Sequence, residues 1–272
     1  MELDKQVDAF AARGLNVAAI SYDPPAVLKY FRDKRKLRYP LLSDEGSKII
    51  RAFGILNESV KPDAPVYGIP HPGTFIIDPA GVVKSKYFED NYTERTTGSA
   101  ILVKEFGAAA GGAGSTIETR HLKLTASSSA GIVRGGQKVM LIVDVELKKK
   151  MHVYAPGAAG YKSIDWKSPA SELYRMGDLA APPAKTLYLK AIKEKVPVYL
   201  GSFRLTRDVT LGNQKALKAA SGEAGEITIE SEFLYQACDD KVCYPPETVP
   251  LRWKVLFEGH DSERAPKELR KF

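Results

Sequence analysis

Cysteine is almost absent from this chain. Its 272 residues include only two, Cys238 and Cys243, five positions apart near the C-terminal end. A tetrahedral metal site would need two further ligands, and the four histidines show no metal-binding spacing with the pair or with each other: His71, His121, His152 and His260. The sequence therefore predicts no metal site and no other cofactor, and most of its reactive chemistry depends on the two thiols.

Long apolar runs are missing as well. No stretch of eighteen apolar residues occurs, which predicts no integral membrane span in this chain. The first residues, MELDKQVDAF, are charged and amphipathic and do not have the pattern of a secretory signal. The net charge is +7, but the basic clusters at 34–38 and 148–150 lack interleaved aromatic residues, so we expect no nucleic-acid partner.

The composition suits a globular protein of two domains, with 44% hydrophobic residues over 272 positions. The stretch GAAAGGAGS consists of small residues that cannot pack a core, which predicts a flexible linker. Alternating helix and strand patterns precede it, and strand patterns follow it. We expect a first domain at 1–106, a linker at 107–115, a second domain at 116–258 and a charged tail at 259–272.

The first segment has the pattern of an α/β layer fold. Leu3, Val7 and Phe10 recur at helical spacing, and Gly14 suits a left-handed helix end. The short apolar run VAAIS is typical of a buried strand. The later elements are a helix that opens at Pro24 and Pro25, a helix capped by Ser43 or Asp44, two strands at 73–78 and 82–88, and a helix at 94–104.

Three blocks of this segment, ELDKQVDAFAARGLNVAAISYD, YPLLSD and HPGTFIIDPAGVV, resemble the redoxins, the AhpC/TSA peroxiredoxin branch of the thioredoxin fold. In that family a central strand and a Pro-x-x-x-Thr-x-x-Cys loop precede the helix at which this chain begins. The resemblance implies a redoxin domain that is truncated at its N-terminus. We expect the natural protein to continue upstream; the alternative is that another strand fills the gap in the sheet.

No cysteine precedes Cys238. A thiol peroxidase needs a thiolate nucleophile, so we do not expect peroxidase activity from this chain. His71–Pro72 lies where thioredoxin-like folds often carry a cis-proline, but an ordinary trans bond is an equal alternative.

The second segment is typical of an all-β module. Val139, Leu141, Val143 and Val145 alternate on one face of a strand, and about seven such runs are separated by glycine-containing turns. This pattern predicts a two-sheet sandwich of immunoglobulin-like build. The Cys-Trp-Cys spacing of antibody domains is absent, so the two cysteines are not expected to join the two sheets.

The cysteines lie in the stretch LYQACDDKVCYPPETVPL. If the flanking runs form a hairpin, the two thiols oppose each other across four residues at a separation that suits a disulfide. So short a loop would stabilise the fold by only about 2 kcal/mol. A disulfide at an exposed tip is better placed for exchange with another thiol, and Pro245 and Pro246 would end strand pairing beside it. A purely structural clip is the alternative.

The motif YQACDDKVCYPPETVPL resembles the active-site signature of the amino-terminal domain of the DsbD family, the bacterial thiol:disulfide interchange proteins. The resemblance implies that Cys238 and Cys243 are the catalytic pair, that the partners are thioredoxin-fold redox proteins, and that the compartment is periplasmic or secreted. The family's usual spacing is five residues, where this chain has four, which affects bond geometry and potential more than the general chemistry.

Further candidate residues surround the pair. MHVYAP resembles the family strand whose tyrosine lies near the cysteines, which indicates Tyr154, and the stretch 192–201 is a candidate capping loop. Asp239 and Asp240 would disfavour a thiolate at Cys238, and Lys241 would partly offset them. The remaining supporting candidates are Tyr235 and Tyr244. The competing interpretation is a non-catalytic binding or scaffolding module with a degenerate redoxin domain and a structural disulfide.

Overall fold

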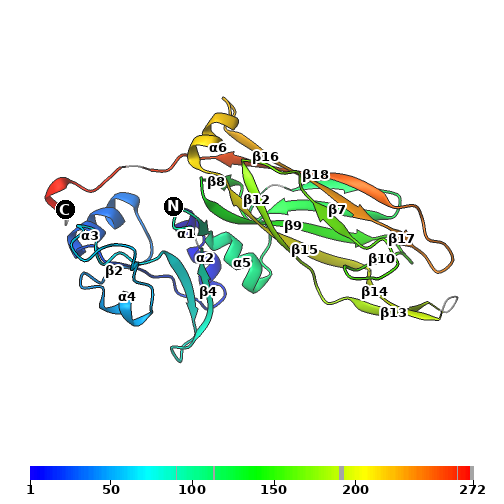
Figure 1. Ribbon diagram of the computed structural model, residues 1–272, viewed down its shortest axis with the longest axis horizontal. Helices are drawn as coiled ribbons and strands as arrows, with labels where there is room; N and C mark the ends of the chain where they lie inside the picture. Colours follow the sequence, from blue (N-terminus) through cyan, green and yellow to red (C-terminus); the bar gives the residue numbers. More distant parts are fainter. Residues whose placement is uncertain (90, 113, 190–192, 262, 270–272) are drawn as a thin grey trace. The chain divides into compact units, whose positions relative to one another are not determined.

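The computed structural model describes residues 1–89, 91–112, 114–189, 193–261 and 263–269 (Figure 1). The chain divides into two compact units. The first combines Met1–Glu105 with His260–Phe272, and the second spans Phe106–Gly259. Among the described residues, no helix has both the length and the apolar character that a membrane span requires.

The first unit is of α/β type, with short elements. Its helices and strands are α1 (Glu2–Lys5), α2 (Val7–Ala11), β1 (Ala19–Ser21), α3 (Pro25–Arg35), β2 (Leu41–Ser43), α4 (Lys48–Ala52), β3 (Gly73–Ile77), β4 (Val83–Phe88), β5 (Arg95–Thr96) and α5 (Gly98–Phe106). Parallel β1 and β2 form one pair, and antiparallel β3 and β4 form another. Within the described part of the chain, β1 and β3 do not pair with each other.

Local sequence explains most of these elements. Pro25 opens α3, where its fixed φ and missing N–H cost nothing. Asp44 accepts hydrogen bonds from the backbone N–H groups of Lys48 and Ile50 and so satisfies the start of α4. The single helix expected from Leu3 to Phe10 is instead divided into α1 and α2 at Gln6. The His71–Pro72 bond is trans.

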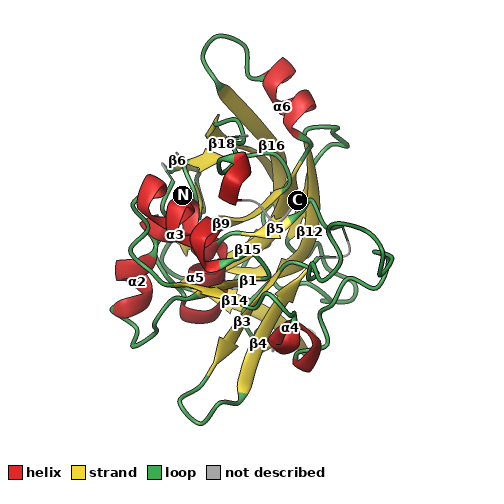
Figure 2. Ribbon diagram, turned by 90° about the vertical axis from the view of Figure 1, so that its left-hand side faces the viewer, coloured by secondary structure: helices red, strands yellow, loops and turns green. Residues whose placement is uncertain are grey.

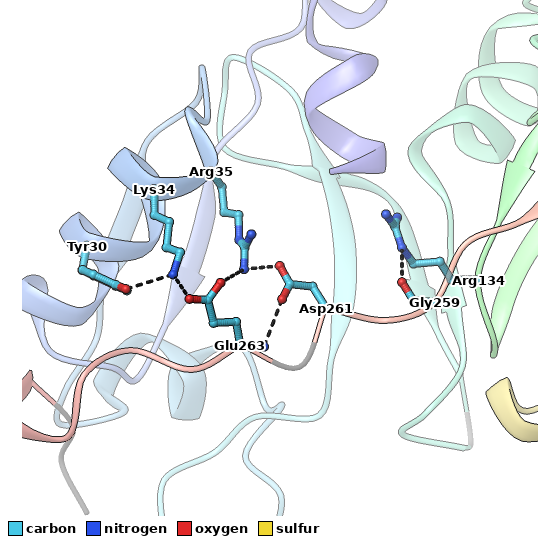
Figure 3. Close-up of polar contacts among 7 residues, drawn as sticks. All are labelled: Tyr30, Lys34, Arg35, Arg134, Gly259, Asp261 and Glu263. Atoms are coloured by element: carbon cyan, nitrogen blue, oxygen red, sulfur yellow. Dashed lines mark hydrogen bonds and ion pairs between the residues drawn. The ribbon is translucent and has the colours of Figure 1, made fainter.

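The C-terminal segment is tied to α3 by charge (Figure 3). Lys34 is paired with Glu263 and also donates to the Tyr30 hydroxyl at 3.1 Å. Arg35 is paired with Asp261 and lies 3.7 Å from a Glu263 oxygen. These acidic side chains therefore contact the last turn of α3. That turn is basic, and the helix dipole favours its cationic side chains.

Strands make up nearly all of the regular secondary structure of the second unit (Figure 2). Its elements are β6 (Ser115–Glu118), β7 (Leu122–Ser128), β8 (Ile132–Val133), β9 (Gln137–Leu147), β10 (His152–Tyr154), β11 (Asp165–Lys167), β12 (Tyr174–Ala180), β13 (Lys185–Leu189), β14 (Glu194–Leu200), β15 (Ser202–Leu211), α6 (Gln214–Ala220), β16 (Glu226–Tyr235), β17 (Ala237–Cys238) and β18 (Glu247–Phe257). Ser115, the last residue of the predicted linker, already belongs to β6.

Two larger sheets enclose the main core of this unit. One contains the order β12-β15-β9-β7-β6 and the other the order β11-β16-β18-β8. The alternating valines and leucines of β9 point into the core, as their period of two predicts. Trp166 and Trp253 stack at 5.5 Å between ring centroids, and the Trp253 indole donates to the Ser127 carbonyl at 2.8 Å, which joins the two sheets.

A third, smaller sheet has the order β13-β14-β10-β17. Successive side chains of its strands face opposite sides. Val153 and Ala237 belong to the main core, whereas their neighbours Tyr154 and Cys238 belong to a separate small cluster. This sheet therefore carries the first cysteine away from the main core, on a face that has its own apolar packing.

Candidate functional site

The site is built at the tip of the β16–β18 hairpin. The two strands pair antiparallel from Glu226 with Leu256 to Tyr235 with Glu247, and they lie side by side in Figure 1. Beyond Tyr235 the continuous β16–β18 ladder ends: β17 joins β10, and the two arms meet again at an isolated antiparallel bridge between Cys238 and Cys243. β18 begins directly after Pro245 and Pro246, which cannot donate to a strand ladder. The predicted hairpin is therefore present, and β17 at its tip also pairs with β10 of the third sheet.

Cys238 and Cys243 form a disulfide with a Cα–Cα separation of 4.0 Å. Their environments differ. Cys238 is 1% exposed and packs with Val196 and Val198, whereas Cys243 is exposed to solvent. The expectation of an exposed tip holds for the second sulfur only. A nucleophile from another protein can therefore approach Cys243 but not Cys238.

The Tyr154 hydroxyl lies between the two sulfurs. Its oxygen is 3.4 Å from Sγ of Cys238 and 3.4 Å from Sγ of Cys243. The side chain is 1% exposed, and burial raises the pKa of the phenol, so the hydroxyl keeps its proton. The Tyr161 ring stacks on it at 4.3 Å, and the Tyr161 hydroxyl donates to Glu194 at 2.9 Å.

Asp239 holds the loop between the cysteines. One carboxylate oxygen accepts from the backbone N–H groups of Lys241 at 2.7 Å and Val242 at 2.8 Å, and the other accepts from the Tyr244 hydroxyl at 2.9 Å. These bonds, led by the one from Lys241, lower the pKa of the Asp239 carboxyl. The loop is thus fixed by one ionised side chain rather than by strand pairing alone.

Tyr235 lies behind the loop, at the end of β16. Its hydroxyl donates to Glu247 at 2.5 Å and lies 2.8 Å from the Thr119 hydroxyl. Burial and the Glu247 carboxylate raise the pKa of Tyr235. Tyr235 therefore anchors the base of the hairpin.

The other predicted residues have different positions. Asp240 is exposed, and Lys241 contributes a backbone N–H to the Asp239 turn, with its side chain exposed. Most of the candidate capping loop at 192–201 is the strand β14, and Ile192 lies outside the described residues. Val196 and Val198 of this strand contact the Cys238 cluster from within the sheet.

Three residues near the disulfide were not predicted from the sequence to belong to the site. His152 is the cross-strand partner of Cys238, and Tyr161 stacks on Tyr154. His121 lies with its ring 4.4 Å from that of Tyr244. The period of two in MHVYAP places His152 and Tyr154 on one face, so the resemblance that indicates Tyr154 also carries a signal for His152. The described residues contain no cluster of three or more His, Cys, Asp or Glu that could hold a metal ion.

Two protein-family models match the chain. Residues 1–86 match the AhpC/TSA family, and residues 123–251 match thiol:disulfide interchange protein DsbD, N-terminal. The chain thus carries a redoxin segment of thioredoxin-like type followed by a DsbD N-terminal segment, which confirms both predicted resemblances and their order.

Individual relatives match over shorter spans. Alkyl hydroperoxide reductase C of Staphylococcus haemolyticus is 34% identical over 88 residues, which are 31% of this chain and 43% of that protein. Chloroplastic peroxiredoxin Q of Oryza sativa is 32% identical over 97 residues, 35% of this chain and 42% of its own. The chain therefore spans less than half the length of these relatives.

Among solved structures, the crystal structure of the Neisseria meningitidis DsbD N-terminal domain in the reduced form is 14% identical. The match covers 43% of this chain and 77% of that one, with a TM-score of 0.31. The N-terminal periplasmic domain of ScsB from Proteus mirabilis is 10% identical over 52% of this chain and 49% of that one, also with a TM-score of 0.31.

Proposed function

We propose that, in a chain that joins an AhpC/TSA segment to a DsbD N-terminal segment, the Cys238–Cys243 pair exchanges electrons with the thiols of thioredoxin-fold proteins. The observation that carries this proposal is the unequal exposure of the two sulfurs, one buried and one open, with the Tyr154 hydroxyl 3.4 Å from each. The family matches support thiol–disulfide redox chemistry. The immunoglobulin-like build of the sandwich belongs to the same proposal.

The exchange begins at the exposed sulfur. A partner thiolate attacks Sγ of Cys243, a mixed disulfide forms, and the electron pair of the broken bond passes to Sγ of Cys238. A second partner thiolate then attacks the partner's own sulfur in the mixed disulfide and releases Cys243. The partner dithiol is thereby oxidised and the Cys238–Cys243 pair is reduced. In the reverse direction, a Cys243 thiolate attacks the partner's disulfide to form the mixed disulfide, and the Cys238 thiolate then attacks Sγ of Cys243 and releases the reduced partner.

The leaving thiolate at the buried end of the bond needs a hydrogen-bond donor. A thiolate formed at Cys238 has little access to water, and an unpaired buried charge is costly. The Tyr154 hydroxyl keeps its proton and lies within reach, so it can donate a hydrogen bond to that thiolate. Tyr154 thus acts on both sulfurs, and Asp239 presents Cys243 by fixing the loop.

The competing function is a binding module with a structural clip. Closing a loop this short would stabilise the fold by only about 2 kcal/mol. Cys243 is exposed to solvent at the tip, and a purely structural disulfide would not require this exposure. Both observations favour exchange over a stapling role.

Trapping the mixed disulfide tests the proposal. The oxidised protein is incubated with a reduced thioredoxin that retains only its attacking cysteine, and the adduct is digested and analysed by mass spectrometry. We expect a covalent adduct linked through Cys243. An adduct linked mainly through Cys238 would refute the proposed order of attack. Failure to form any adduct without denaturant would favour the structural clip.

A further inference from the structure

A buried histidine lies directly across from the buried cysteine. His152 of β10 is the Cα partner of Cys238 in β17, and its side chain is 4% exposed. Directly opposed residues of an antiparallel pair project to the same side of the sheet. The ring of His152 also meets that of Tyr154, two residues along, at 5.8 Å and perpendicular. His152, Tyr154 and Cys238 therefore share one face.

The imidazole of His152 has an unused group. Its Nε2 atom is buried and has no hydrogen-bond partner among the described residues. A buried polar atom without a partner is costly in a folded protein. This Nε2 atom lies beside a cysteine that must become a thiolate during exchange, and it could accept a proton in that step.

Burial and two carboxylates set the charge state of His152. Burial lowers the pKa of the imidazole, and the carboxylates of Asp240 and Asp239 oppose this to a smaller degree. On the other neighbouring strand, β14, its Cα partner is the apolar Leu200. His152 is therefore neutral while the disulfide is intact, and the strongest new charge that can arise near it is a thiolate at Cys238.

We propose that His152 is a positioning residue for exchange, which takes up a proton when the disulfide opens and thereby holds Cys238 as a thiolate. This inference rests on the proposed function. Reduction of the pair takes two electrons from the partner dithiol and two protons. One proton goes to Cys243, and in this arrangement the other goes to the His152 imidazole instead of the Cys238 sulfur.

Thermodynamic linkage makes the proposal quantitative. An imidazolium that favours the thiolate must itself be favoured by that thiolate to the same extent. Opposite charges within a few ångströms typically change acidity by at least about tenfold. The proton affinity of His152 should therefore rise on reduction by at least about tenfold, and the acidity of the Cys238 thiol should fall by the same factor when the imidazole is removed.

The test uses the full chain in both redox states. The four histidines are titrated by NMR in the oxidised and the dithiothreitol-reduced protein, and thiolate formation at Cys238 is followed by its absorbance near 240 nm in a Cys243→Ala background. His152→Gln replaces the imidazole by a polar group that cannot become charged. His121→Gln is the matched control, because His121 is also buried with an unpartnered Nε2 but lies against Tyr244.

We expect the titration of His152 to move on reduction, and the acidity of Cys238 to fall at least about tenfold in His152→Gln and less than about twofold in His121→Gln. A His152 titration that is the same in both redox states overturns the inference, and this measurement needs no variant that must fold. If the oxidised protein still exchanges with thioredoxin in that case, the proposed function stands. If it does not exchange, both fail.

Discussion

Replacing Tyr154 by Phe removes one oxygen atom from the site and little else. The ring can keep its stacking with Tyr161 and its packing in the Cys238 cluster. Among the described residues, the lost hydroxyl is the polar group in contact with the sulfurs, at 3.4 Å from each. The substitution thus isolates the donor that we propose for the leaving thiolate.

The size of the effect follows from the charge that the hydroxyl meets. In the disulfide, both sulfurs are weak acceptors, so the oxidised fold should lose less than about 1 kcal/mol of stability. A hydrogen bond to a charged acceptor is worth about 1.5–3 kcal/mol. The oxygen–sulfur distance of 3.4 Å favours the lower end. Reduction of the pair should therefore slow about tenfold, since 1.4 kcal/mol corresponds to a factor of ten.

The potential should move in a defined direction. Removing a donor to the Cys238 thiolate destabilises the reduced form where that thiolate is populated. The disulfide then becomes harder to reduce, by about 30 mV for 1.4 kcal/mol in a two-electron couple. Stopped-flow mixing with a reduced thioredoxin measures the rate, and titration against defined glutathione ratios measures the potential.

Tyr161→Phe is the matched control. It removes a hydroxyl from the ring that stacks on Tyr154, but this hydroxyl is bound to Glu194 and not to sulfur. We expect its rate and potential to stay near those of the wild type. The reasoning fails if Tyr154→Phe reacts within about twofold of the wild type, or if both variants slow equally.

Three further outcomes follow from the same structure. Reduction of the disulfide should lower the free energy of unfolding of the second unit by only about 2 kcal/mol, measured by urea denaturation with and without dithiothreitol; loss of folding on reduction would contradict this. Asp239→Asn should loosen the cysteine loop at neutral pH, seen as faster amide exchange at Lys241 and Val242. Because the folded pKa of Asp239 is lowered, its support is present above the usual carboxyl pKa of about 3.9 and is lost as pH falls below it, so wild type and variant should converge in acid. Asp261→Asn with Glu263→Gln should increase proteolysis after Arg264 and Lys267 at low salt, and high salt should remove the difference, because these exposed ion pairs with α3 are screened; equal cleavage at low salt would contradict the charge attachment.

Local signals in the sequence predicted the parts of the site that are close together in the chain. The runs on either side of the cysteines alternate with a period of two and end at Pro245 and Pro246, which is enough to place a hairpin and a disulfide at its tip. Tyr154 is 84 residues from Cys238. It was found through the family resemblance of MHVYAP and not through periodicity.

Contacts that depend on strand order were out of reach. Nothing in the composition of β10 or β17 indicates that they pair, so the opposition of His152 and Cys238 had no signal of its own. The stretch 192–201 is similar: the family resemblance indicated a capping loop, but tertiary pairing with β10 and β13 makes most of it the strand β14.

The unequal burial of the two cysteines shows why this information is tertiary. The hairpin alone would place Cys238 and Cys243 together at an exposed tip. Because β17 leaves the β16–β18 pair after Tyr235 and joins β10, the face on which Cys238 lies is set by the register of a different sheet. A slip of one residue in that register would exchange the positions of Ala237 and Cys238, which now belong to separate clusters. The sulfur that a partner can attack is therefore selected by one strand pairing that the hairpin sequence does not encode by itself.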